Sequence, residues 1–348
     1  MNGWRPILMD RETSLLSSEF RKTVLIDPIE QGADHLKIVA GYATPMMASW
    51  HIKEISEARA KLKPIKITLI VGMCVNDGIS QAMHDGFFDI VSRKESKNRS
   101  SLTCQYVIEG SAVHSKLYLW ERNGVPYKAF MGSANYTQAA FSRNRRELLQ
   151  ECNPKQALDY FNEIEKNSMY CNHIEIEDKI KIFIKPNHPI LDSENTPLVS
   201  VKGAGVESLK LSLLTENGEV GFGSGINWGH RRNGTPRNPN QMYISLPVHV
   251  KKRHPNFFPI IGNRSGKGNP NFSVLTDDGI HFILRVQQEN NKGITTPLDN
   301  SRLGEYFRSR IGVEYGAFVT KQDIEKYGRT DVTFYKLDDE QYFMDFSV

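Results

Sequence analysis

Long apolar runs, paired cysteines and a secretory signal are all missing from this chain of 348 residues. No run reaches the roughly 18 apolar residues of a membrane-spanning helix. The N-terminus lacks the basic-then-apolar pattern of a signal peptide, so we expect a cytoplasmic protein without a membrane partner. The four cysteines are widely spaced and form no Cys-x-x-Cys pair, which favours reduced thiols and argues against disulfides and a zinc site.

A nucleotide-binding loop is absent as well. The sequence contains no Gly-x-x-x-x-Gly-Lys-Ser/Thr segment, so nothing in it is built to bind ATP. The composition, with 39% hydrophobic and 24% charged residues, is ordinary for globular proteins, and the length suffices for two domains with their own cores. The net charge of +4 is too small by itself to indicate a nucleic-acid partner.

Acidic residues are missing from one long stretch. Residues 220–276 contain no Asp or Glu, although they carry many cations and amides. Lys and Arg neutralise DNA phosphates, and Arg and Asn make bidentate contacts with base edges. A solvated basic face is the alternative, but such faces usually mix both signs, so we favour double-stranded DNA as the partner. The candidate contacts are Arg231, Arg232, Arg237, Asn238, Lys251, Lys252, Arg253, Arg264 and Lys267.

A candidate catalytic segment begins at His114. The side chains around it alternate as in a strand, so His114 and Lys116 point to the same face and share one pocket. After turn residues at Asn123-Gly124, a second apolar run at residues 127–131 predicts a hairpin. This hairpin brings Gly132-Ser133-Ala134-Asn135 beside the histidine and the lysine.

The converging segments predict a phosphate-binding pocket. The small residues at the first and third positions of the second segment let a tetrahedral anion approach the backbone, while Lys116, Ser133 and Asn135 donate hydrogen bonds to it. A histidine there attacks phosphorus or protonates a leaving oxygen, and Glu147 is the candidate carboxylate that orients the ring. We expect no metal ion and no other cofactor, because the three donors stabilise the charge that a metal ion otherwise would.

The order of these residues resembles the signature of the phospholipase D superfamily. The matching positions are His114-x-Lys116, an acid at Glu121, Gly132-Ser133-x-Asn135 and Glu147. The superfamily usually has Asp where this chain has Glu121, at a position generally thought structural. Together with Ser-Gly-Ile-Asn-Trp-Gly, which ends at Gly229, the motifs are most similar to those of NgoFVII/NgoAVII-like restriction endonucleases.

Other His-x-Lys sequences include those that begin at His51 and His249. Neither is followed at the right distance by Gly-Ser-x-Asn. His51 lies in a helix-like run, where we expect a surface residue, and we assign no catalytic role to either histidine.

The fold expected for the N-terminal part is an α/β sheet wrapped by helices. Apolar runs at residues 37–43 and 65–73 flank a helix-like segment at 46–62, which is βαβ order. A further helix at 79–92 and a strand at 103–108 follow, and residues 156–167 predict a closing helix.

The C-terminal part has short strands punctuated by turn residues, which indicates a small barrel. The expected strands are residues 209–214, 242–246, 271–275 and 281–286, and Thr276-Asp-Asp-Gly-Ile predicts a tight hairpin between the last two. The domains expected are 1–175 (catalytic and dimerising), 176–200 (linker) and 201–348 (DNA-binding). Residues 180–184 in the linker are a possible edge strand.

The resemblance also has implications for the C-terminal fold and for the oligomeric state. It implies that the C-terminal domain is similar to the B3 DNA-binding pseudobarrel, with a first arm around residues 228–237 and a second near 288–302 or at Arg308. Trp228 is expected to pack rather than to stack on a base. Because the chain has one motif where the superfamily generally uses two, the resemblance also implies a homodimer through the N-terminal domain, with two His114 residues in one composite site.

The expected function is therefore sequence-specific, metal-independent cleavage of DNA through a covalent phosphohistidine. The alternative is a DNA-binding regulator that uses an inactive phospholipase D-like scaffold for dimerisation. The restriction resemblance further implies a partner DNA methyltransferase, and some relatives work with a separate ATP-dependent translocase. Cleavage of lipid phosphodiesters has no support, because no amphipathic membrane segment is evident.

Overall fold

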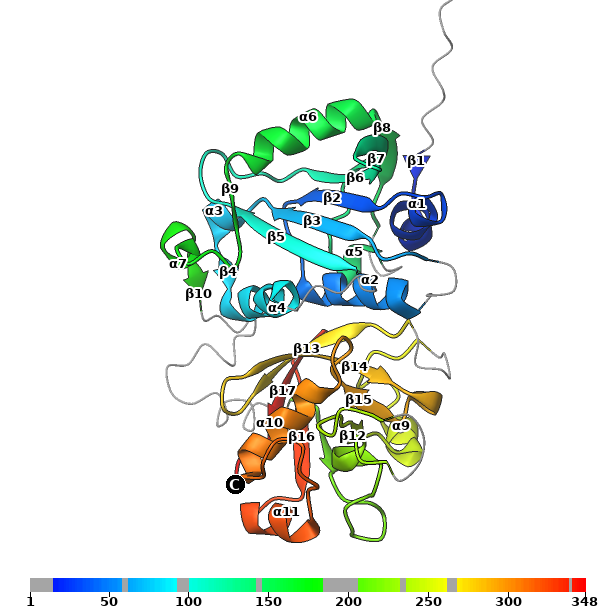
Figure 1. Ribbon diagram of the computed structural model, residues 1–348, viewed down its shortest axis with the longest axis vertical. Coiled ribbons are helices and arrows are strands. Elements are labelled where there is room, and N and C mark those ends of the chain that lie inside the picture. Colours follow the sequence, from blue (N-terminus) through cyan, green and yellow to red (C-terminus); the bar gives the residue numbers. More distant parts are fainter. Residues whose placement is uncertain are drawn as a thin grey trace, which may run out of the picture. The chain divides into compact units, whose positions relative to one another are not determined.

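The computed structural model describes residues 15–57, 62–92, 100–141, 146–183, 206–231, 236–261, 268–337 and 340–348 (Figure 1). The chain forms two compact units. The first consists of Met1–Thr44, Ala58–Gly78 and Val91–Lys181, and the second of Pro45–Glu57, Ile79–Ile90 and Ile182–Val348. Among the helices in the described ranges, none combines the length and apolar character needed to span a bilayer.

The first unit is built on a mixed sheet of eight strands. Its central strands β2, β3 and β5 run parallel, and β6 pairs antiparallel with β2. The three apolar runs assigned to strands in this half are therefore confirmed. In sheet order the strands are β1 (Leu15–Leu16), β8 (Leu149–Cys152), β7 (Val125–Gly132), β6 (Lys116–Arg122), β2 (His35–Ala40), β3 (Lys66–Val71), β5 (Ser101–Val107) and β9 (Ser168–Tyr170).

Helices follow these strands along the chain in the expected order. α2 (Pro45–Glu57) comes after β2, and α4 (Gln81–Val91) comes after β3, so the βαβ order is confirmed. His51 on α2 is fully buried, which corrects its expected place on the surface. α6 (Pro154–Glu165) begins at Asn153, whose side chain accepts hydrogen bonds from two backbone N–H groups of the first turn.

Strand β6 separates two packed faces. Leu117 and Leu119 lie in a buried cluster with Phe161 of α6, which covers one face of the sheet (Figure 1). On the opposite face the indole of Trp120 donates a hydrogen bond of 2.7 Å to the Val24 carbonyl. The alternation expected around His114 thus holds along the strand that follows it.

The hairpin between β6 and β7 is confirmed. Asn123 and Gly124 have φ angles of 52° and 76°, as the right-handed twist of a two-residue hairpin turn requires. The antiparallel register pairs Leu117 with Met131. The start of β6 and the end of β7 therefore lie side by side at one edge of the sheet.

Glu121 belongs to a buried polar cluster on β6, β2 and β3. Its carboxylate lies 3.0 Å from Lys37 Nζ and 3.1 Å from His35 Nδ1. Burial lowers the pKa of His35, and its Nε2 lies 2.8 Å from the Thr68 hydroxyl. These contacts give the acid of the motif a structural role.

We expect Glu121→Gln to lower the free energy of unfolding by about 2–3 kcal/mol, because it leaves the partly buried Lys37 ammonium without its counter-charge. Urea-induced unfolding measures this. Glu151→Gln is the matched control, since Glu151 pairs with Lys128 near the surface of the same sheet and its loss should cost at most about 0.5 kcal/mol. Equal losses in the two variants would contradict the structural role of Glu121.

The second unit is built on a sheet of seven strands. Only β13 and β17 pair in parallel, and the two end strands, β11 and β12, contact each other, so the sheet is a nearly closed barrel. In sheet order the strands are β11 (Ser208–Ser212), β16 (Asp331–Lys336), β17 (Gln341–Asp345), β13 (Asn271–Thr276), β14 (His281–Gln287), β15 (Gly293–Thr295) and β12 (Ile244–Ser245). The four expected strands and the hairpin joining β13 to β14 are confirmed.

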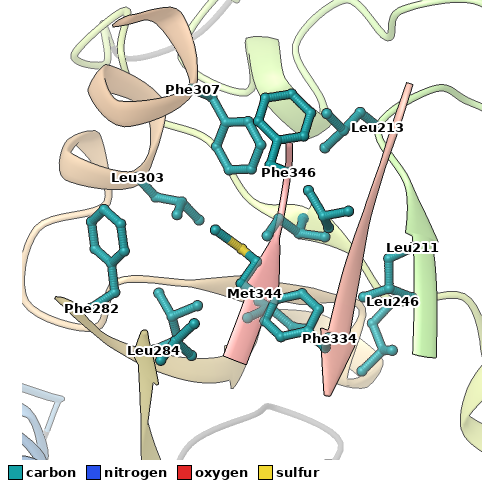
Figure 2. Close-up of a cluster of buried hydrophobic side chains, with 14 of the residues drawn as sticks. Leu211, Leu213, Leu246, Phe282, Leu284, Leu303, Phe307, Phe334, Met344 and Phe346 are labelled. Atoms are coloured by element: carbon teal, nitrogen blue, oxygen red, sulfur yellow. The ribbon is translucent and has the colours of Figure 1, made fainter. Parts of the chain in front are cut away.

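The core of this unit lies between the strands and α10 (Ser301–Ile311) (Figure 2). Leucine, phenylalanine and methionine side chains fill it, and most are fully buried. The unit also contains α9 (Val248–Arg253) and α11 (Lys321–Tyr327) and, by the division given above, α2 and most of α4. The labelled core residues are Leu211, Leu213, Leu246, Phe282, Leu284, Leu303, Phe307, Phe334, Met344 and Phe346.

The expected linker contains two short elements. α7 (Ile176–Lys179) is followed by β10 (Ile182–Phe183), which pairs in parallel with β4 (Ile79–Ser80). The expected edge strand is thus present. The rest of that linker, from residue 184, lies outside the described residues.

Candidate active site and nucleic-acid interface

The candidate catalytic residues gather at one edge of the first sheet. His114 and Lys116 lie at the start of β6, and Ser133 and Asn135 follow the end of β7. The antiparallel pairing of the two strands brings these ends together. The expected convergence of the two segments is therefore present in the structure.

Lys116 and His114 share one pocket. The lysine Nζ donates to the His114 carbonyl at 2.6 Å and lies 3.1 Å and 3.3 Å from the two ring nitrogens. Burial lowers the pKa of Lys116, while the negative charge of Glu147 acts in the opposite direction. The histidine is exposed, and the lysine is only 7% exposed, so the cation lies beneath the imidazole rather than in bulk water.

Ser133 and Glu147 form a second pair at this edge. The Ser133 hydroxyl donates to the Glu147 carboxylate and accepts a hydrogen bond of 3.0 Å from the Leu148 N–H. In the described structure Glu147 makes no hydrogen bond to His114. The expectation that this carboxylate orients the ring stays a prediction. In the structure the carboxylate is bound by the serine hydroxyl.

Asn135 is held by the chain that follows β2. Its Oδ1 accepts a hydrogen bond of 3.1 Å from the Tyr42 N–H. Because a backbone donor occupies the oxygen, the amide nitrogen is the group left to donate to a ligand. This orientation suits a phosphate oxygen.

Tyr42 is a site residue that sequence reasoning missed. Its ring meets the His114 ring edge-on, with centroids 5.9 Å apart, and its hydroxyl donates to Asp77 at 2.6 Å. This hydrogen bond raises the pKa of Tyr42. Its position just after the carboxyl end of a parallel strand was the signal that could have indicated it.

The two small residues of the phosphate-binding segment also serve packing, and their expected role beside an anion stays a prediction. A Cβ on Gly132 would lie 2.1 Å from the Leu148 carbonyl oxygen, so glycine is required for β7 to approach the next strand. Ala134 is fully buried, and its carbonyl accepts a hydrogen bond from Tyr118.

The candidate DNA contacts differ in exposure. Arg231, Asn238, Lys252 and Arg253 are exposed, whereas Arg232, Arg264 and Lys267 lie outside the described residues. Arg237 stacks over the Trp228 ring, 4.2 Å from its centroid, and the Trp228 ring also meets Tyr243 edge-on. Trp228 thus packs within the protein, as expected.

Two basic residues bind protein carbonyls instead. Lys251 Nζ donates to the carbonyls of Asn290 and Asn291. Arg308, expected as part of a second arm, is fully buried, which excludes a DNA contact in this conformation. Its guanidinium donates to the carbonyls of Gly304, Ala317, Ile226 and Pro239.

No group of three or more His, Cys, Asp or Glu side chains that could hold a metal ion occurs among the residues that the structure describes. At the candidate active site the donors to an anion are instead cationic and neutral side chains. Lys116 contacts the His114 ring directly, and Asn135 binds the backbone of Tyr42, whose ring meets that of His114.

Comparisons with solved structures find matches to 46% of this chain. NucT from Helicobacter pylori is 17% identical over 46% of this chain and 98% of its own, with a TM-score of 0.30. Nuc from Salmonella typhimurium, a phospholipase D family member, is 17% identical over the same shares, with a TM-score of 0.32. Polyphosphate kinase from Porphyromonas gingivalis is 13% identical over 46% of this chain and 25% of its own, with a TM-score of 0.30. No curated protein matches the chain.

Two family models together account for most of the sequence. The model of the NgoFVII restriction endonuclease N-terminal phospholipase D domain matches residues 18–178. The model of the NgoFVII C-terminal B3-like DNA-binding domain matches residues 201–338. With the α/β sheet and the nearly closed barrel described above, these matches show that the chain belongs to the NgoFVII family of restriction endonucleases, in the phospholipase D superfamily.

Proposed function

We propose that this protein is a sequence-specific, metal-independent restriction endonuclease that cleaves DNA through a covalent phosphohistidine. The observation that carries the proposal is the placement of Lys116 Nζ against the exposed His114 ring, beside Ser133 and Asn135. An exposed imidazole next to a cation and two neutral hydrogen-bonding groups is suited to a phosphodiester.

In the proposed reaction the neutral ring of His114 attacks phosphorus. The new N–P bond forms as the bond to the leaving oxygen breaks, and a second imidazolium donates its proton to that oxygen. Lys116 and the Asn135 amide stabilise the charge on the non-bridging oxygens. The second imidazole then takes a proton from water, whose oxygen attacks phosphorus and releases His114.

The second imidazole comes from another copy of this chain. Each chain has one complete motif, so a homodimer through the N-terminal domain with a two-fold axis would place two His114 residues in one composite site. We propose residues 1–175 as the catalytic and dimerising domain, 176–200 as the linker and 201–348 as the DNA-binding domain. The proposed partners are double-stranded DNA, a cognate DNA methyltransferase and, as for some relatives, a separate ATP-dependent translocase.

Cleavage of unmethylated plasmid and phage DNA in excess EDTA tests the proposal. We expect discrete fragments, because Lys116 and the neutral donors replace a metal ion in stabilising the transition state. The contrary outcome is DNA that stays intact although a gel-shift assay shows tight binding. In that case the nuclease hypothesis holds only if an added ATPase partner restores cutting. Without restoration, the protein is a DNA-binding regulator on a phospholipase D-like scaffold.

A further inference from the structure

The loop between β14 and β15 has an unusual backbone. Gln288, Asn290 and Asn291 have φ angles of 70°, 59° and 54°, in the left-handed region that non-glycine residues rarely adopt. A backbone of this kind is strained, so the surrounding structure must hold the loop in place. The side chains that do so come from two other segments of the same unit.

The first of these is Lys251 on α9. Its ammonium donates to the carbonyl of Asn290 and, at 3.0 Å, to the carbonyl of Asn291. The cation thus binds the carbonyls of two consecutive residues, both of which have a left-handed backbone conformation. This lysine is half-buried, whereas the next two cations of the helix, Lys252 and Arg253, are exposed.

The second is Asn269, which is fully buried. Its Nδ2 donates to Asn291 Oδ1 at 2.7 Å and to the Val286 carbonyl at 2.9 Å, and its Oδ1 accepts from the Ile261 N–H at 3.1 Å. Both ends of the loop are thus tied to one buried amide. Such a fully satisfied polar network fixes a single conformation.

The loop exposes two side chains suited to base edges, those of Glu289 and Asn290. The Nε2 atoms of Gln287 and Gln288 are buried and have no hydrogen-bond partner within the described residues. Amides pair with adenine in the major groove, and a carboxylate accepts from cytosine. A rigid loop with such side chains can discriminate sequences only if its backbone keeps one shape.

We propose that Lys251 and Asn269 are positioning residues for sequence recognition: they hold the loop of residues 288–292 in the shape in which its side chains meet base edges. In this role the ammonium of Lys251 binds protein carbonyls, whereas that of Lys252 neutralises a DNA phosphate. The inference rests on the proposed function. It replaces the expectation that Lys251 itself contacts DNA.

The test compares two substitutions on one helix, both in His114→Ala protein so that the DNA stays intact. Binding sites are first selected from a pool of randomised DNA duplexes. The affinity of Lys251→Met and Lys252→Met is then measured for a selected duplex and for a scrambled one, over a range of salt concentrations. A phosphate contact and a positioning contact differ both in the ratio of the two affinities and in the salt dependence of binding.

For Lys251→Met we expect the affinity for the selected duplex to fall about 10- to 100-fold, the range for lost base contacts, with little change for the scrambled duplex. The salt slope should stay constant. For Lys252→Met both affinities should fall together, and the slope of log K against log[salt] should decrease by about 0.9. Lys251→Arg, which keeps the donors, should restore discrimination.

Equal losses on both duplexes with a reduced salt slope in Lys251→Met would overturn the inference and make Lys251 a phosphate contact. Unchanged discrimination in that variant would overturn it too. If the His114→Ala protein itself enriches no sequence from the pool, the proposed sequence specificity fails, and the inference fails with it.

Discussion

His114→Ala is expected to lower the rate of DNA cleavage by at least about 10⁴-fold, while DNA binding is kept. Removing a nucleophile from a covalent mechanism costs this much in comparable hydrolases, since neighbouring groups cannot replace it. His114 is exposed and contributes nothing to the core, so the variant should fold normally. Single-turnover cleavage of plasmid DNA in EDTA measures the rate, and a gel-shift assay measures binding.

His249→Ala is the matched control, because His249 begins another His-x-Lys sequence but is an exposed residue on α9. Its cleavage rate should stay within about twofold of that of the wild type, as for surface substitutions in general. A protein–DNA adduct trapped by denaturation under alkaline conditions should form with this variant and not with His114→Ala. An adduct in His114→Ala would assign the nucleophile to another residue.

Arg308→Ala is expected to destabilise the second unit by about 3–5 kcal/mol. The guanidinium is fully buried and donates to four carbonyl groups, among them Ile226 and Pro239, which lie on either side of the first-arm residues 228–237. Its loss leaves a cavity and unsatisfied carbonyls, and each buried acceptor costs about 1–3 kcal/mol. Differential scanning calorimetry should show a melting temperature lower by about 10 °C.

Arg253→Ala provides the comparison for Arg308→Ala. Arg253 is exposed on α9, so its loss should leave the melting temperature within about 2 °C of the wild-type value. A small shift in Arg308→Ala would mean that the carbonyls find other donors. In that case the structure would not need this arginine to hold the base of the first arm.

Much of the fold follows from local sequence pattern. The alternation through Leu117 and Leu119, the Asn123-Gly124 turn and the short apolar runs of the barrel are properties of neighbouring residues, and each corresponds to an observed element. The meeting of His114 with Asn135 was also predictable, because a hairpin fixes which ends of two strands lie together.

The remaining site contacts depend on residues far apart in the sequence. Tyr42 reaches His114 only because β2 lies beside β6. The resemblance placed Arg308 in a second arm, but its guanidinium binds the carbonyls of Ile226 and Pro239, which are far from it in the sequence. Glu147 stays the candidate that orients the histidine, and in the structure it accepts a hydrogen bond from Ser133. The sequence pattern predicts which face of a helix or strand is buried. The contacts between distant side chains arise only when the elements pack together.

The parallel pairing of β13 with β17 also governs how the protein is made. β17 lies inside the barrel sheet, between β16 and β13, although 64 residues separate the end of β13 from its start. The barrel therefore cannot close until residue 345 has left the ribosome, whereas every strand of the first sheet is complete by Tyr170. The first sheet is able to form while the barrel is still being synthesised, so the proposed sequence-directed binding is the last property that the nascent chain acquires.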